Sequence, residues 1–466
     1  MKYLDALKIY NKGKPAWCSP RKGSVDYKTV IAIMKGIHQS TPLSAKKSSQ
    51  LKGSLTNSSQ LKVSIEIAKI SSKKPSSKSL LFNKANVIQR FIKLKNKLII
   101  TKYNKANVIQ RFLKNKLILT KHNLDTRIQR YNLIKKRLTN IKSKKCLTKK
   151  MFKNKQGYTI EGIVNLENKI GSDSVNASIY LTSIPYLLGS YPIASKLMKV
   201  NANNESETKI NEWITENLIL KKQSKHFVIM YKSTKCPPLE GIANKLLTGE
   251  RLVNYNELCD GDLSALMKTG VRNDEETMLN LAFQVLIAIA TYQNRIGYCH
   301  KDTHHGNFLY QENNEVGYYH YIYNGLDFYI KSCKYNMYIF DFGLSENISK
   351  VDNNTKFRDY VRVSMAFISK KANGIGWIDD DMDKNVSETM YRLMRRLASI
   401  SGSNERIRNF DFFQEVIDDI FKKYKTNTGI FTTVKPSNVL NEIPFVINKV
   451  EAYPKINFGR ANNIII

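Results

Sequence analysis

Residues 298–310 read YCHKDTHHGNFLY, and residues 338–345 read YIFDFGLS. The first stretch presents Asp302 and Asn307 five residues apart, and the second presents Asp341 directly before Phe-Gly. Two loops that each offer an oxygen ligand can hold a divalent cation on the phosphates of a nucleotide, while a separate carboxylate orients an attacking hydroxyl. Such a reaction consists mostly of positioning and charge neutralisation. The two stretches therefore predict a phosphoryl-transfer site.

The HKD of residues 300–302, Asn307 and the DFG of residues 341–343 together resemble the catalytic and metal-binding loops of the protein kinases. The resemblance implies an α+β fold of two lobes, with a β-rich small lobe and a mainly helical large lobe. It also implies that ATP binds between the lobes, that Asp302 is the catalytic base, and that Asn307 and Asp341 bind Mg²⁺, with Mn²⁺ as an alternative.

A phosphate-covering loop is expected in the small lobe, and KIGSDSVNASIYLT at residues 169–182 stands where it belongs. Only Gly171 of the family's three glycines remains. Ser174 and Ala177 would have to let the backbone approach the phosphates. Without the resemblance, the same stretch reads as a turn between two strands.

The resemblance further implies a strand Lys that contacts ATP and a helix Glu that pairs with it. PIASKLMK at residues 192–199 makes Lys196 the candidate. Glu212 and Glu216 share one face of the expected helix at residues 207–221, and Glu216 is the preferred partner. Glu207 ranks below both.

NELCDGDLSALM at residues 256–267 resembles the hinge that binds adenine through its backbone. Main-chain atoms from Glu257 to Cys259 would make those hydrogen bonds. A second interpretation is a helix capped by Asp262 near its start, and the two are compatible.

Downstream, the sequence departs from typical protein kinases. A Tyr-rich insertion at residues 317–333 predicts a β-hairpin with its turn at Asn324-Gly325. This insertion, and His304 in place of the usual loop Lys, resemble haspin-type kinases, and His304 would take over the charge-stabilising role of that Lys. No Ala-Pro-Glu follows the DFG, so the activation segment is expected to be very short. As a whole the kinase-like part resembles the serine/threonine kinases of large cytoplasmic DNA viruses.

Positive charge is concentrated at the amino-terminal end of the chain. Residues 1–150 hold 37 Lys and Arg against 4 Asp and Glu, whereas residues 151–466 hold 38 against 35. This asymmetry favours a polyanionic partner, with nucleic acid before an acidic membrane or protein, and the alternative is a solvated, disordered tail.

The arm contains a repeat. NKANVIQRFIK at residues 83–93 returns at residues 104–114, and a degenerate copy, RIQRYNLIKKRL, spans residues 127–138. Each copy predicts a basic amphipathic helix. The repeated Ile-Gln-Arg-Phe resembles a truncated IQ motif, the type of helix that binds calmodulin. A calmodulin-like partner is not expected, because the Gly and Arg that follow in a complete IQ motif are missing. The expected organisation is a small element (1–38), a Ser/Lys-rich linker (39–80), helical repeats (81–150), a small lobe (151–256), a large lobe (257–425) and a tail (426–466).

Six cysteines without a CxxC motif favour a reducing, intracellular compartment, and they indicate neither a disulfide scaffold nor a zinc site. The longest apolar stretch, residues 279–292, is too short to span a bilayer.

The leading hypothesis is an ATP-dependent serine/threonine kinase that acts on protein substrates. The alternatives are a virion or nucleic-acid-binding protein with an inactive kinase-like scaffold, and a small-molecule phosphotransferase.

Overall fold

The computed structural model describes residues 122–141, 146–152, 155–170, 177–185, 187, 193–237, 249–368, 386–403, 410–424 and 429–456. All of them belong to one compact unit, Tyr103–Ile466. The expected element at 1–38, the linker at 39–80 and the first two repeat copies lie outside the described residues, as do Gly171 and Ser174.

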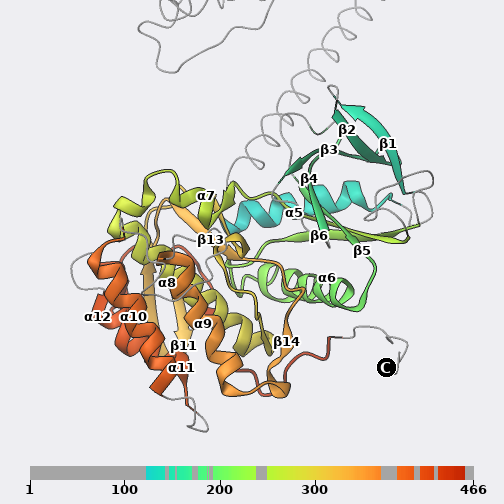
Figure 1. The fold of residues 1–466 in the computed structure, drawn as a ribbon. Helices are drawn as coiled ribbons and strands as arrows, with labels where there is room; N and C mark the ends of the chain where they lie inside the picture. Colours follow the sequence, from blue (N-terminus) through green and yellow to red (C-terminus); the bar gives the residue numbers. More distant parts are fainter. Residues whose placement is uncertain are drawn as a thin grey trace, which may run out of the picture. The chain divides into compact units, whose positions relative to one another are not determined.

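The amino-terminal part of this unit is a curled antiparallel sheet of seven strands (Figure 1). Its order is β1-β2-β3-β4-β5-β7-β6. Side chains along β4 largely alternate between buried and half-buried, as expected for a strand with one face on the core. The strands are β1 (Leu147–Phe152), β2 (Lys155–Ile160), β3 (Val164–Ile170), β4 (Ala177–Ser183), β5 (Ile193–Lys199), β6 (Met230–Cys236) and β7 (Arg251–Glu257).

Two helices pack against this sheet near β6 and β7. Helix α6 (Ala202–Ile214) begins after Asn201, whose side chain accepts a hydrogen bond from the amide of Asn204, and contacts both strands. Helix α5 (Leu124–Leu138) is capped by Asn123 and contacts β6 (Figure 1). Because α5 is the third repeat copy, the expected domain boundary at residue 151 does not separate the repeats from the folded unit.

The rest of the unit is mainly helical and is built around α8 (Glu275–Thr291). Every residue from Met278 to Thr291 is buried, which explains why this segment is apolar except at Asn280, Gln284 and Thr291. The expected cap at Asp262 is confirmed, since its carboxylate accepts from the amide of Ala265. The other helices are α7 (Leu263–Met267), α9 (Asn353–Ile368), α10 (Glu388–Ser403), α11 (Phe412–Glu415) and α12 (Lys422–Tyr424).

Short strands position the loops around α8. They form two small sheets: β8 (Gly261–Asp262), β10 (Phe308–Glu312) and β13 (Tyr335–Ile339) in one, and β9 (Tyr298–Cys299) with β14 (Glu346–Asn347) in the other. The carboxyl end of β13 leads into Asp341, and the amino end of β10 follows Asn307 directly. The two loops singled out in the sequence therefore leave neighbouring antiparallel strands.

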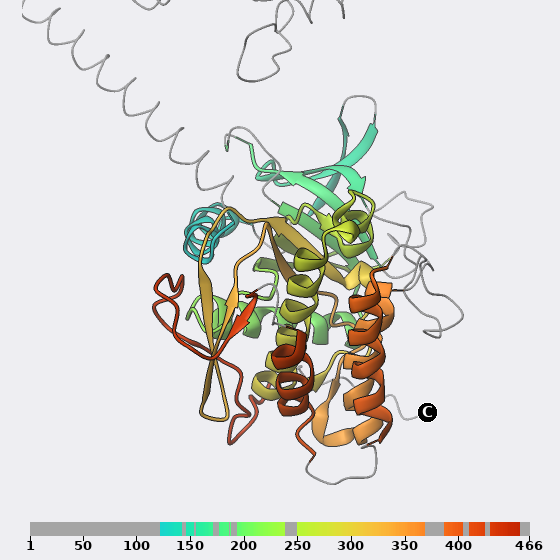
Figure 2. The same ribbon diagram turned by 90° about the vertical axis from the view of Figure 1, so that its left-hand side faces the viewer.

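The predicted hairpin is confirmed. Strands β11 (Tyr318–Tyr323) and β12 (Leu326–Lys331) pair around Asn324 and Gly325, which both have positive φ. The carboxyl-terminal segment, for which the sequence offered no account, adds β15 (Phe431–Thr432) to β12 and β16 (Phe445–Val446) to β11. In Figure 2 this segment (red) lies beside the hairpin.

The α+β class is thus observed, and the separation into a sheet part and a helical part is compatible with two lobes. Two details differ from expectation. The apolar run HFVIMY at residues 226–231 predicts a strand, but β6 begins only at Met230, because residues 224–229 run as a connection bonded to β13. Cys146 and Cys236 form a disulfide that the cysteine spacing did not indicate. No helix within the described ranges is long and apolar enough to cross a bilayer.

Candidate functional site

Lys196 lies at the centre of a buried charge cluster. It sits on β5 between β4 and β7, and only 4% of its surface is exposed. Its Nζ donates to both carboxylate oxygens of Glu207, at 2.7 and 2.8 Å, and to Oδ1 of Asp341 at 2.9 Å. The cluster therefore joins the seven-stranded sheet to the loop that follows β13.

The partner of Lys196 is Glu207, and the preference for Glu216 or Glu212 was wrong. Helix α6 begins near residue 202, so Glu207 faces the sheet. Glu216 follows nine residues later, about two and a half turns on, and is exposed on the opposite face. Glu212 is half-exposed and pairs with Lys209.

The loop at residues 300–307 is hydrogen-bonded to α9. Asp359 is fully buried, and its carboxylate accepts from the amides of His300 at 2.7 Å and Lys301 at 2.8 Å. These bonds fix Lys301 in the left-handed region, at φ 66°. A non-glycine residue in that region indicates backbone strain that the surroundings impose, and such strain is often found at functional sites.

Asp302 carries the single carboxylate of residues 300–307, and three groups orient it. Asn307 Nδ2 donates to Asp302 Oδ2 at 3.1 Å. The amide of Gly306 donates to His304 Nδ1, which places the ring hydrogen on Nε2, 3.5 Å from Asp302 Oδ2. An Arg362 nitrogen lies 3.8 Å from Asp302 Oδ1. His304 and Arg362 therefore both lie beside the Asp302 carboxylate, and Arg362 is the group of the two that is cationic regardless of tautomer.

Two hydrogen bonds tie the two loops together through Phe340. Its amide donates to the carbonyl of Asn307 at 3.0 Å, and its carbonyl accepts from His300 Nε2 at 2.9 Å. Asp341 follows at once, with φ 65°, a second non-glycine residue in the left-handed region. The structure therefore brings together the residues that the two sequence stretches singled out.

Asn307 and Asp341 suit a hard cation such as Mg²⁺. The Nδ2 group of Asn307 is occupied by Asp302, which leaves its Oδ1 for a cation, and Asp341 keeps Oδ2 beside the oxygen bonded to Lys196. Oxygen ligands of this kind bind Mg²⁺ in company with waters and substrate phosphates. Within the described ranges, no cluster of three or more His, Cys, Asp or Glu side chains could hold a metal by itself.

The two carboxylates that share Lys196 titrate differently. Burial, reinforced by the charge of Asp341, raises the pKa of Glu207 to about 7 even though Lys196 opposes the shift. Burial also acts to raise the pKa of Asp341, but the Lys196 ammonium lowers it below its ordinary value. Glu207 is therefore the member of the cluster that changes charge near neutral pH.

Asp302 stays ionised over a wide range. Partial burial acts to raise its pKa, but the hydrogen bond and charge of His304, followed by the charges of His300 and Arg362, lower it below the ordinary value. An ionised carboxylate at this position can accept a hydrogen bond from a hydroxyl group and then its proton.

The segment from Glu257 to Cys259 connects β7 to the helical part, as the hinge interpretation requires. Glu257 does more than offer main-chain atoms, because its side chain is 1% exposed and forms ion pairs with Arg127 and Arg130 of α5. Cys259 is half-buried between Leu258 and Asp260, whose main-chain groups bond to β10. Ala177 is buried at the start of β4 and pairs with Met198 rather than lying in an open loop.

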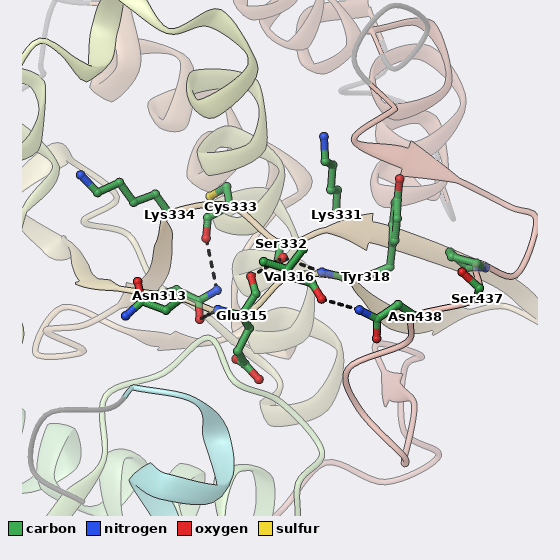
Figure 3. Close-up of a pocket in the computed structure, with 13 residues that line it drawn as sticks. Asn313, Glu315, Val316, Tyr318, Lys331, Ser332, Cys333, Lys334, Ser437 and Asn438 are labelled. Carbon is green, nitrogen blue, oxygen red and sulfur yellow. Dashed lines mark hydrogen bonds between the residues drawn. The ribbon is translucent and has the colours of Figure 1, made fainter. Parts of the chain in front are cut away.

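A pocket of about 550 Å³ lies elsewhere, between the hairpin and the carboxyl-terminal segment. Its lining includes none of the residues of the charge cluster. Figure 3 shows that its polar groups bond one another: Asn313 donates to the Cys333 carbonyl, and Asn438 donates to the Val316 carbonyl. The Asn438 bond attaches the carboxyl-terminal segment to the residues that lead into the hairpin.

Comparison with models of known protein families and with curated proteins finds no match for this chain. The site is therefore characterised by its geometry alone: an α+β framework in which a buried Lys–Glu pair, two acidic loops and a connecting segment meet.

Sequence reasoning missed three residues of this arrangement. Glu207 ranks below Glu212 and Glu216 in the sequence analysis, Asp359 is not singled out there, and Arg127 belongs to a stretch predicted only to be a basic amphipathic helix. The sequence around Asp359 gives no local signal of burial, because Arg358 precedes it directly and an Asp is rarely fully buried unless it is paired.

Proposed function

We propose that this protein is an ATP-dependent phosphotransferase of the protein-kinase type that phosphorylates serine or threonine hydroxyls of proteins. The observation that carries the proposal is the convergence of Lys196, Glu207 and Asp341 beside the loop that holds Asp302 and Asn307. Groups of these types at these positions are what phosphoryl transfer from a nucleotide requires.

Each residue has a role in the proposal. Lys196, oriented by Glu207, binds phosphate oxygens of ATP, while Asn307 and Asp341 hold Mg²⁺ on the triphosphate. Asp302 orients the acceptor hydroxyl and takes its proton. Arg362 supplies positive charge beside the transferred phosphoryl group, His304 donates a hydrogen bond there through Nε2, and main-chain atoms between Glu257 and Cys259 bind adenine.

The test is phosphate transfer from radiolabelled Mg-ATP to basic and acidic model proteins by the purified full chain. Asp302→Ala and Lys196→Met should each lower turnover by about a thousandfold, comparable to the loss of a transition-state contact. Glu207→Gln should have a large effect, whereas Glu212→Gln on the same helix should have almost none. Equal incorporation by the parent and the Asp302→Ala variant would identify a contaminant and refute the proposal.

A small-molecule acceptor is a second candidate, and one observation favours it. Nine residues, 344–352, separate Gly343 from α9, which starts at Asn353. This leaves little chain to build a docking surface for an extended peptide. A screen of hydroxyl-bearing small molecules beside the protein substrates separates the two candidates, because only one class of acceptor should be turned over efficiently.

We also propose that the basic arm binds a polyanion, with nucleic acid first. The support is the excess of 37 basic over 4 acidic residues in residues 1–150. Two of the three arginines of the third repeat copy do not contribute, because Arg127 and Arg130 are buried against Glu257, whereas Arg137 is exposed.

A further inference from the structure

Helix α5 carries a buried arginine, Arg127, whereas the arginines of a solvated basic helix are exposed. Arg127 is 1% exposed, and its guanidinium binds the carboxylate of Glu257 through Nε at 3.0 and 3.1 Å and through a terminal nitrogen at 2.7 Å. Its terminal nitrogens also donate to the carbonyls of Lys225 and Phe227. Glu257 is the last residue of β7, immediately before the connection to the helical part.

The same guanidinium reaches the helical part. It lies over the ring of Tyr338 on β13, 4.3 Å from the ring centroid. The Tyr338 hydroxyl donates to Gln311 Oε1 at 3.0 Å, and Gln311 Nε2 donates to the carbonyl of Leu258 at 2.7 Å. Leu258 follows Glu257 in the chain, so these contacts form a closed ring around the connecting segment.

This ring, made by Arg127, Glu257, Leu258, Gln311 and Tyr338, also adjoins the two loops of the site. Gln311 stands four residues after Asn307 on β10, and Tyr338 stands three residues before Asp341 on β13. Both side chains are fully buried. A shift of Arg127 would therefore loosen the adenine segment and both strands that carry the cation ligands.

Arg127 is also particular to the third repeat copy. When the three copies are aligned on Ile-Gln-Arg, Val87 and Val108 occupy its position, whereas Arg130 matches Arg90 and Arg111. An arginine at this position is therefore not part of the repeat pattern. It is needed for the contacts with Glu257 and Tyr338.

We propose that Arg127 is a positioning residue for nucleotide binding, so that a helix of the basic arm completes the nucleotide site by fixing the Glu257–Cys259 segment. The inference rests on the proposed function for its nucleotide. The bidentate guanidinium supplies two fixed directions, and a lysine cannot reproduce them.

The test compares Arg127→Met with Ile134→Ala in the full chain. Ile134 is fully buried on the same helix but lies outside the ring, so its substitution loosens α5 without touching Glu257. Arg127→Met should raise the Kd of a non-hydrolysable ATP analogue about tenfold or more and raise KM for ATP while changing kcat less. Ile134→Ala should leave both constants within about twofold. Arg127→Lys should fall between, and it replaces Arg127→Met if that variant is insoluble.

Hydrogen exchange provides a readout that needs no nucleotide. The amide of Asp260, bonded to the Tyr310 carbonyl at 2.9 Å, should exchange about tenfold faster in Arg127→Met than in Ile134→Ala. A parent that binds no nucleotide refutes the proposed function, and the exchange rates still decide whether Arg127 fixes the segment. Equal exchange and equal nucleotide affinity in the Arg127 and Ile134 variants would overturn the inference.

Discussion

At the scale of single residues, the site is governed by two carboxylates that share one ammonium. Glu207 and Asp341 both contact Lys196; Lys196 and Glu207 are buried, whereas the Asp341 side chain is 40% exposed. One cation cannot fully compensate two adjacent anions, so one acid must titrate at higher pH. Burial makes that acid Glu207, whose pKa is raised to about 7.

The raised pKa of Glu207 predicts how phosphate transfer depends on pH. Below about pH 7 Glu207 is protonated, and a neutral carboxyl no longer orients Lys196 by charge. Activity should therefore fall as the pH decreases through about 7. The measurement is kcat/KM for ATP between pH 5.5 and 8.5, values chosen to bracket that titration by roughly 1.5 units on each side.

Glu207→Gln serves as the comparison, since it cannot titrate. Its low residual activity should lose the acidic limb attributed to Glu207, while Glu212→Gln should keep the parent's profile. A limb of unchanged midpoint in Glu207→Gln would assign the titration to another group.

Site residues that belong to a short sequence motif could be predicted, whereas those that depend on the orientation of a helix could not. Asp302, Asn307 and Asp341 lie in short stretches whose resemblance to the kinase loops implies that they meet, and the structure brings these loops together. Glu207 could not be chosen over Glu216, because that choice depends on where α6 begins and which face meets the sheet. Helix boundaries are uncertain by several residues in sequence reasoning, and a few residues rotate a side chain to the opposite face.

At the scale of elements, the hairpin depends on the carboxyl-terminal segment. Strands β15 and β16 each contribute only two residues, and β16 inserts Phe445 beside the rings of Tyr321 and Tyr319, at centroid distances of 5.4 and 6.3 Å. The hairpin was predictable from its Asn-Gly turn and alternating side chains. Strands of two residues have no periodicity to detect, so their pairing could not be predicted.

This packing predicts that Phe445→Ala destabilises the protein strongly. Phe445 is buried, and a Phe to Ala change in a core costs about 3–5 kcal/mol of the free energy of unfolding. Chemical denaturation followed by circular dichroism measures the loss. Val434→Ala is the control, because Val434 is exposed in the same segment and should change the free energy by less than about 0.5 kcal/mol. Similar midpoints for both variants would show that the segment does not support the hairpin.

At the scale of the whole molecule, the end of the basic arm predicted from charge differs from the start of the folded unit. The excess of basic residues ends near residue 150, yet α5 and β1 begin before that position and are part of the compact unit. Composition reports only the average polarity of a stretch. It does not reveal that two of its arginines, Arg127 and Arg130, neutralise a buried Glu257.

Two truncations separate these boundaries. Deletion of residues 1–121 removes 27 Lys and Arg and 3 acidic residues but keeps α5, so folding and phosphate transfer should persist. Deletion of residues 1–150 leaves Glu257 buried without a cationic partner, which by itself costs about 3–5 kcal/mol, and also removes the packing of Ile134 and Leu138. The longer deletion should therefore unfold or precipitate. Equal stability of both truncated proteins, measured by thermal unfolding, would contradict the role given to α5.

The shorter truncation also tests the polyanion proposal, because the fold is retained while the charge is removed. The parent should bind a labelled DNA duplex with an affinity that falls steeply as salt rises, since each neutralised phosphate adds about −0.9 to the slope of log K against log salt. Deletion of residues 1–121 should abolish this binding, measured by fluorescence anisotropy over a salt series. If the truncated protein binds DNA with the parent's affinity and salt slope, the positive charge of the arm is not what attracts nucleic acid.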